Sequence, residues 1–156
     1  WSSDVCSSDL TFHPLIVSDV RRETNDCVSI AFQVPAELQD KYQFKPGQYL
    51  TLRATVGGED IRRSYSICSA PHQQELRVAI KRVEHGQFST WATHEVRIGD
   101  TMQVMTPTGT FTSDIQPERK QTYLMIAAGS GITPILSLTK TILNTEPHSE
   151  IGRAHV

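Results

Sequence analysis

The sequence has few cysteines and no pattern of metal ligands. Three of its 156 residues are cysteine, at Cys6, Cys27 and Cys68, and no two of them form a CxxC pair or fall at metal-ligand spacing. A disulfide-stapled secreted domain and a structural zinc site are therefore not expected, and we predict no metal ligand in this chain. Isolated cysteines instead favour a reducing, cytoplasmic setting.

Long apolar runs and an excess of one charge are also lacking. The longest apolar stretch, 123–138, is interrupted by Gly129, Gly131 and Pro134 and falls short of the ~20 residues that cross a bilayer. The formal net charge is only -2, so no broad basic surface for nucleic acid is indicated. We expect a soluble protein whose partners include neither a membrane nor a nucleic acid.

The two ends of the chain lack the periodicity of folded elements and are related as nucleic acid. Residues 151–156 can be encoded by a DNA segment whose reverse complement encodes residues 4–9, and this segment resembles a sequencing-library adapter. We interpret residues 1–10 and 150–156 as translated adapter. Without them, the 15 Lys and Arg lose one residue and the 17 Asp and Glu lose three, which leaves an insert without formal net charge.

Within the insert, short β-rich runs alternate with turn residues as far as Phe111. The fold class that we predict is mainly β: a six-stranded antiparallel barrel at 11–112 with one short helix at 88–96. A polar linker at 113–122 leads to a continuous apolar strand and a helix, which read as the first unit of a truncated parallel α/β domain at 123–149. The six barrel strands are predicted at 15–20, 27–34, 49–56, 61–68, 75–83 and 101–105.

The first chemical motif is RRSYSI, residues 62–67. Because side chains alternate along a strand, Arg63 and Tyr65 share one face, and Ser64 and Ser66 share the other. A guanidinium and a phenol on one face can hold a phosphate and pack on a flat ring. Taken alone, the motif fits an edge strand with a solvated face at least as well.

The second motif, AIKRVEHGQFSTW at 79–91, joins a strand to a helix. Gly86 allows close backbone approach at a helix start, where free amides suit a pyrophosphate, and Ser89 is a candidate N-cap. An ordinary capped helix remains an equal alternative. His85 and His94 have no Ser, Cys or metal partner at suitable spacing, so both are interpreted as surface histidines.

The third motif is the loop GSGITP at 129–134. Thr133 is a candidate cap for the following helix, and Pro134 fits its first turn, which leaves amides available to an anion. The loop matches neither GxGxxG with a ribose-binding acid nor the P-loop pattern. A tight strand-to-helix turn that binds no ligand therefore remains an equal alternative to an anion-binding loop.

Together with PGQY at 46–49, these motifs occur in an order that resembles the ferredoxin-NADP reductase superfamily. Within it, VPAELQDKYQFKPGQYLTLRA and RRSYSIC resemble the reductase components of phenylacetyl-CoA epoxidase systems. The resemblance implies an FAD-binding barrel followed by an NAD(P)-binding α/β domain.

The resemblance also implies roles for individual residues. Ser66 and Thr133 would be catalytic, lying near the reactive flavin nitrogen and at the flavin edge. The implied cofactor-binding residues are Arg63, Ser64, Tyr65, Ser66, Ile80, Lys81, Gly86, Gln87, Ser89, Gly131 and Thr133. FAD would be the cofactor, with FMN as the alternative, and the flavin would carry the redox chemistry.

The departure from the family is truncation. The parent would take electrons from NADPH and pass them through FAD and a 2Fe-2S centre, missing here, to the subunits of a di-iron oxygenase. The fragment itself would lack turnover, and its strand 123–128 would expose apolar surface that missing strands cover. The alternatives are a reductase of another oxygenase or hydroxylase, a flavohaemoprotein module, or a non-catalytic flavin-binding barrel.

Overall fold

The computed structural model describes residues 11–155, with side chains described through residue 152. The prediction of translated adapter at 1–10 lies outside the described residues. The described chain contains strands β1 to β8 and helices α1 (Gln87–His94) and α2 (Ile132–Thr145). The strands are β1 (Phe12–Thr24), β2 (Cys27–Gln33), β3 (Tyr49–Val56), β4 (Glu59–Ser66), β5 (Leu76–Lys81), β6 (Thr101–Met105), β7 (Thr122–Ala127) and β8 (Glu150–His155).

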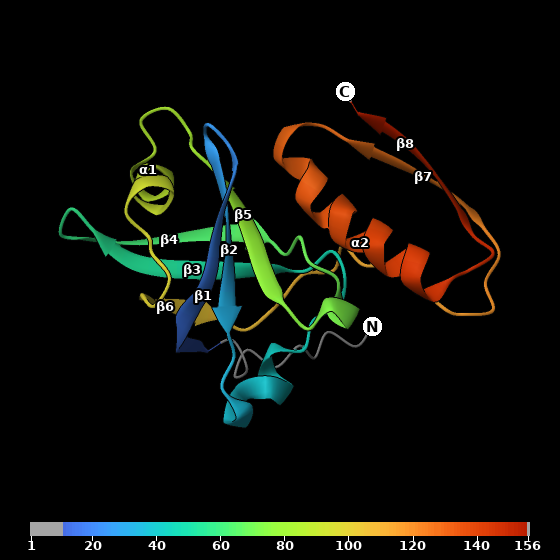
Figure 1. The fold of residues 1–156 in the computed structure, drawn as a ribbon, viewed down its shortest axis with the longest axis horizontal. Coiled ribbons are helices and arrows are strands. Elements are labelled where there is room, and N and C mark those ends of the chain that lie inside the picture. Colours follow the sequence, from blue (N-terminus) through green and yellow to red (C-terminus); the bar gives the residue numbers. More distant parts are fainter. Residues whose placement is uncertain (1–10, 156) are drawn as a thin grey trace, which may run out of the picture.

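Six antiparallel strands form a curved sheet in the order β4-β3-β6-β1-β2-β5, as predicted in number and direction (Figure 1). An isolated bridge between Ile67 and Val78 joins the chain after β4 to β5, so the two edges of the sheet meet. The predicted strand at 101–105 has the observed bounds, whereas β1 is longer than predicted at both ends. Two register shifts in β1 allow this long strand to bend between β2 and β6.

The barrel core follows the period-two pattern of its strands. Leu50 and Leu52 of β3, and Val78 and Ile80 of β5, are fully buried, while the residues between them point to the other face. At the entry to β3, Gly47 has φ +95 and a side chain there would meet the Phe111 carbonyl oxygen at 1.7 Å, so the PGQY turn requires glycine.

Two short 3-10 helices, Ala36–Tyr42 and Pro71–Gln73, were not predicted. The helix predicted at 88–96 corresponds to α1, and the two 3-10 helices lie in the barrel region in addition to it. The first of them buries Tyr42, whose hydroxyl donates to the Val104 carbonyl at 2.6 Å. This tertiary hydrogen bond is invisible to a local sequence pattern, because its partner lies 62 positions away.

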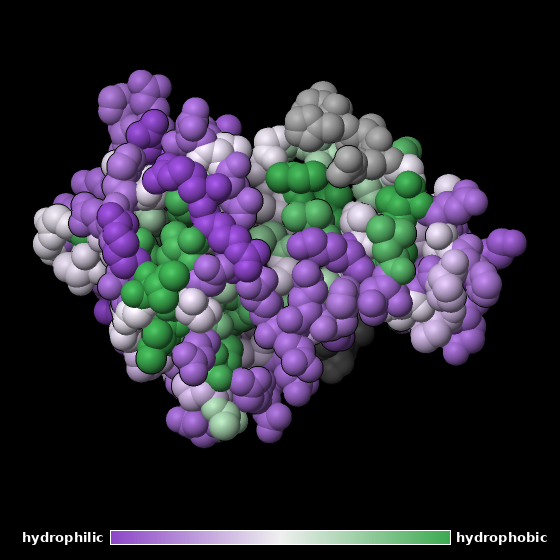
Figure 2. Space-filling view, in the orientation of Figure 1, coloured by the Kyte–Doolittle hydropathy of each residue, from purple (hydrophilic) through white to green (hydrophobic). Residues whose placement is uncertain are grey.

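A second unit beside the barrel contains β7, β8 and α2 (Figure 1). β7 and β8 pair in parallel, and α2 packs Ile135, Leu138 and Ile142 against β7. β8 is built from the segment that we interpret as translated adapter, and that interpretation stays a prediction. The exposure predicted for strand 123–128 is confirmed, because Leu124 is 70% and Ile126 is 60% exposed. Figure 2 shows hydrophobic side chains reaching the surface over this unit.

The buried carboxylate of Glu146 ties the linker to the end of α2. It accepts hydrogen bonds from the Tyr123 hydroxyl at 2.9 Å, the Ser149 hydroxyl at 2.6 Å and the Gln116 amide at 3.1 Å. Burial alone would raise the pKa of Glu146, but these donors outweigh it and hold the pKa below its usual value.

Neither α1 nor α2, the α-helices of the described residues, has the length and apolar composition of a membrane-spanning helix.

Candidate cofactor site

Strand β4 presents its motif residues on two faces. Tyr65 packs against the barrel core, two positions after Arg63 and four after buried Ile61. On the opposite face, the Ser64 hydroxyl lies 2.9 Å from the hydroxyl of Thr51 on β3. The alternation predicted for this strand is therefore confirmed, and Arg63 lies on the face of Tyr65.

The guanidinium of Arg63 is exposed and donates to the Arg62 carbonyl at 2.7 Å. Among the described residues, no ion pair includes Arg63. Its charge is thus exposed and without a carboxylate partner in the described part of the chain, which leaves it available to an anionic ligand.

An aromatic contact joins β4 to α1. The rings of Tyr65 and Phe88 stack with centroids 6.0 Å apart at 28°, and Trp91 meets Phe88 edge-on at 5.4 Å. Burial raises the pKa of Tyr65 to about 12, against the opposing charge of Arg63, so the phenol is neutral at physiological pH. The contact therefore joins the strand motif to the helix motif.

The start of α1 fits a diphosphate. Gly86 is the N-cap, and no side chain caps the helix. A side chain at Gly86 would meet the Ser89 hydroxyl at 2.6 Å and the Val83 carbonyl oxygen at 3.1 Å, so the loop is closely packed around glycine. Exposed Gln87 follows as the first residue of the helix. An uncapped helix start offers free amides and a positive dipole end, which suit a phosphate group.

The prediction that Ser89 caps α1 is wrong. Ser89 lies in the third position of the helix, where its hydroxyl accepts from the Val83 amide at 3.0 Å and donates to the Gly86 carbonyl at 3.3 Å. The helix begins one residue earlier than predicted, because Gly86 can serve as the N-cap itself. Ser89 therefore fixes the shape of the loop.

β5 places its two predicted residues differently. Ile80 is fully buried in the core, so only its main chain is available to a ligand. The exposed Lys81 ammonium lies 3.5 Å from the Asp26 carboxylate. The pKa of Asp26 is lowered first by the hydrogen bond from the Thr24 hydroxyl and further by Lys81. His85 and His94 are both exposed, as predicted.

Gly131 and Thr133 lie on the second unit, at the start of α2. Gly129–Gly131 form a 3-10 turn, and Gly131 is the N-cap of α2 without a side-chain cap. The prediction that Thr133 caps this helix is wrong, because its hydroxyl donates to the Ser130 carbonyl at 3.0 Å. Pro134 falls in the first turn, as predicted.

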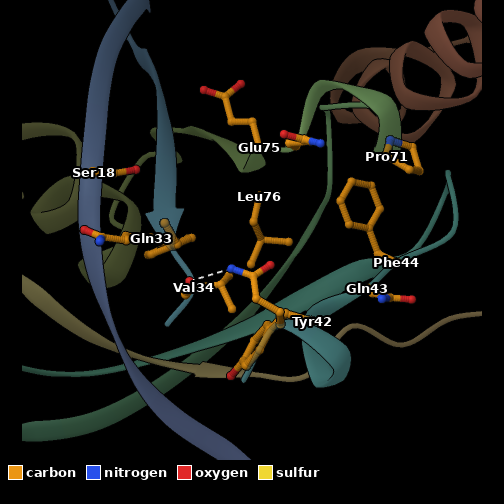
Figure 3. Close-up of a pocket in the computed structure, with 12 residues that line it drawn as sticks. Ser18, Gln33, Val34, Tyr42, Gln43, Phe44, Pro71, Glu75 and Leu76 are labelled. Carbon is orange, nitrogen blue, oxygen red and sulfur yellow. Dashed lines mark hydrogen bonds between the residues drawn. The ribbon is translucent and has the colours of Figure 1, made fainter. Parts of the chain in front are cut away.

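A separate cavity lies beside the 3-10 helices at Ala36–Tyr42 and Pro71–Gln73 (Figure 3). It has a volume of about 750 Å³ and is lined by Phe44, Pro71, Glu75 and Leu76 among others, none of which belongs to the four motifs. The side chains that line it are hydroxyl, amide and apolar groups and the carboxylate of Glu75, with no Lys or Arg among them to hold a diphosphate. Chemistry and packing therefore favour a candidate site at β4 and α1 rather than in this cavity.

Sequence reasoning missed three residues that support the site. The Phe88 ring of α1 stacks on Tyr65 of β4. The Thr51 hydroxyl of β3 forms a hydrogen bond with the Ser64 hydroxyl of β4, and the Asp26 carboxylate forms an ion pair with Lys81. The pairing of Thr51 with Ser64 could have been found from the hairpin turn at Gly57-Gly58, which fixes the register. The contact of Phe88 with Tyr65 and that of Asp26 with Lys81 join residues that are distant in the sequence, so no local pattern reveals them.

Comparison with known proteins agrees with this fold. The oxidoreductase FAD-binding domain family matches residues 14–113. A component of 1,2-phenylacetyl-CoA epoxidase from Escherichia coli K12 is 51% identical over 140 residues, which cover 90% of this chain and 39% of that protein. The chain thus spans about two fifths of the length of this relative.

Two solved structures share the fold. A ferredoxin NADP+ reductase from Neisseria gonorrhoeae with bound FAD and NADP is 25% identical, with a TM-score of 0.72 over 92% of this chain and 57% of that one. Phthalate dioxygenase reductase, a modular structure for electron transfer from pyridine nucleotides to 2Fe-2S, is 26% identical, with a TM-score of 0.75 over 92% of this chain and 43% of that one.

Proposed function

Because this chain belongs to the oxidoreductase FAD-binding domain family of ferredoxin reductase-type flavoproteins, we propose that it binds FAD between β4 and the start of α1. The observation that carries the proposal is the stacking of Tyr65 on Phe88. Arg63 lies two residues before Tyr65, and the uncapped helix start at Gly86 lies two residues before Phe88, so this contact links the strand of the guanidinium to the helix start. A cation and a positive helix end on two linked elements suit a diphosphate.

In this proposal, each residue has a physical task. Arg63 holds a phosphate, and Tyr65 offers a flat, neutral surface to the flavin ring and ribityl chain. Gln87 and Ser89 present main-chain amides to the diphosphate, and Gly86, whose own amide donates to the Val83 carbonyl at 2.9 Å, lets the backbone approach it closely.

The remaining predicted residues lie around the ring. Ser66 lies at the end of β4, where its hydroxyl would donate to the reactive flavin nitrogen. Ser64 lies on the same face of the strand, where its hydroxyl is paired with that of Thr51. Ile80, by its main chain, and Lys81 line the side of β5. When bound, the flavin supplies two-electron uptake and one-electron release.

The whole protein is proposed to be the reductase of an oxygenase system. NADPH would bind at the second unit, where Gly131 and Thr133 would face the nicotinamide. Electrons would then pass through FAD and a 2Fe-2S centre to a di-iron oxygenase acting on phenylacetyl-CoA. The 51% identity to the 1,2-phenylacetyl-CoA epoxidase component supports this substrate, and the likeness to phthalate dioxygenase reductase supports the 2Fe-2S partner. Free thiols at Cys27 and Cys68 suit the reducing cytoplasm.

The proposal is tested by reconstitution. The purified chain is titrated with FAD and, separately, with FMN, and binding is followed by quenching of flavin fluorescence and by the visible spectrum. We expect saturable binding of FAD, and weaker binding of FMN, because FMN has one phosphate for two positively polarised positions. A preparation that takes up neither flavin would refute the site. Equal affinity for FAD and FMN would show that the second phosphate of FAD is not bound, and would contradict the proposed diphosphate site.

A further inference from the structure

A serine hydroxyl of α2 crosses to the barrel. Ser137 Oγ donates to the Ser69 carbonyl oxygen at 2.6 Å. Ser137 is fully buried and Ser69 is only 1% exposed, so water does not compete for this hydrogen bond. A shielded, directional contact of this kind fixes the position of a helix more sharply than apolar packing does.

The direction of this hydroxyl is unusual for a helix. Serine and threonine inside helices commonly donate to the carbonyl four residues earlier. Thr141 does this, with Oγ1 at 2.8 Å from the Ser137 carbonyl oxygen. Ser137 instead points out of its own helix, and Lys140 Nζ donates to the neighbouring Cys68 carbonyl at 3.3 Å. Two consecutive carbonyls of the barrel are therefore held by α2.

The barrel holds the same two residues from the other side. The Cys68 amide donates to the Arg77 carbonyl at 2.9 Å. Ser69 Oγ donates to the Glu75 carbonyl at 2.6 Å and accepts from the Arg77 amide at 3.2 Å. The side chain of Arg77 is buried and bound to Asp19 and Glu75. Cys68 and Ser69, which we name the clamp segment, are thus a fixed part of the barrel.

Both residues of the Ser137–Ser69 hydrogen bond lie close in sequence to predicted site residues. The clamp segment begins two residues after Ser66, and Ser137 follows Thr133 by about one helical turn. We propose that Ser137 is a positioning residue: its hydrogen bond to the clamp segment sets the distance between the loop at Gly129–Thr133 and the flavin edge at Ser66. This inference rests on the proposed function, in which the loop receives the nicotinamide.

The test uses the FAD-reconstituted chain and reduced nicotinamide mononucleotide, which needs no adenosine site. Hydride passes from the reduced nicotinamide to the flavin, solvent supplies the proton, and the oxidised nucleotide is released. The rate of loss of visible flavin absorbance is measured against nucleotide concentration. For Ser137→Ala we expect FAD affinity to be unchanged and the limiting rate of reduction to fall about 10- to 100-fold, because a small misplacement of donor and acceptor is costly.

Thr141→Ala is the matched control, because it removes a hydroxyl from the same helix whose bond stays within the helix. It should leave the rate unchanged. Amide hydrogen exchange provides a readout that needs no nucleotide: Ser137→Ala, but not Thr141→Ala, should lower the protection of the first turns of α2.

The outcomes are distinguishable. Unchanged rate and protection in Ser137→Ala would overturn the inference. A wild-type chain that binds FAD but is never reduced by the nucleotide would contradict the proposed hydride step, and the exchange comparison would then decide alone whether Ser137 positions α2. Equal loss of protection in both variants would reduce Ser137 to a general contributor to helix stability and would also overturn the inference.

Discussion

The ring of Tyr65 stacks on the ring of Phe88, with centroids 6.0 Å apart, and this contact joins the strand motif to the helix motif. Phe88 is 1% exposed, so it belongs at once to the core and to the support of the candidate site. Its replacement should affect stability and flavin binding together.

We predict that Phe88→Leu lowers the free energy of unfolding by about 0.5–3 kcal/mol and also weakens FAD binding, because Tyr65 loses the surface that orients it. Phe32→Leu is the control, since Phe32 is 4% exposed in the same core but lines the separate cavity of Figure 3. Urea unfolding should show similar losses for both variants. Fluorescence titration should show weaker FAD binding only for Phe88→Leu, and equal affinities would remove the stack from the site.

Arg63 and Arg62 provide a matched pair on opposite faces of one strand. Arg63 shares the face of Tyr65, whereas Arg62 lies over the ring of Phe12, 5.3 Å from its centroid, on the other face. We predict that Arg63→Ala weakens FAD binding by about 1.5–3 kcal/mol, the usual contribution of a hydrogen bond to a charged group. Arg62→Ala should change it little.

Titration at two salt concentrations checks this prediction. The loss in Arg63→Ala should shrink at high salt, because screening weakens the attraction of an exposed guanidinium for phosphate. Equal effects of the two variants would show that overall charge, and not the face of β4, governs binding.

The strands and their buried faces could be predicted from the sequence, whereas contacts between residues far apart in the chain could not. Alternation in RSYS and turn residues such as Gly47 were sufficient for the strands and their faces, since both are local properties. The caps of α1 and α2 were mispredicted because Ser89 and Thr133 carry typical capping side chains, while glycines at the preceding turns serve as the N-caps. The contacts of Phe88 and Ser137 join residues that are distant in the sequence, and only the folded barrel brings these together.

Glu146 should make stability depend on pH. Its pKa is lower in the folded chain than the usual 4.5, so its contribution is complete above that value and is lost as the pH falls through the lowered pKa. We predict that Glu146→Gln destabilises the second unit at neutral pH, and that the difference from the wild type narrows on acidification. Thermal unfolding from neutral to acidic pH measures this difference. A constant difference across that range would contradict a role for the ionised carboxylate.

Removal of residues 1–10 and 150–156 should leave flavin binding intact. The barrel core and the residues of the candidate site all lie between positions 11 and 149. Strand β7, however, loses its pairing with β8 and gains further exposed edge. We predict unchanged FAD affinity, together with lower hydrogen-exchange protection in β7 and α2. A shortened chain that no longer binds FAD would show that the terminal segments contribute to the barrel, and it would count against their interpretation as translated adapter.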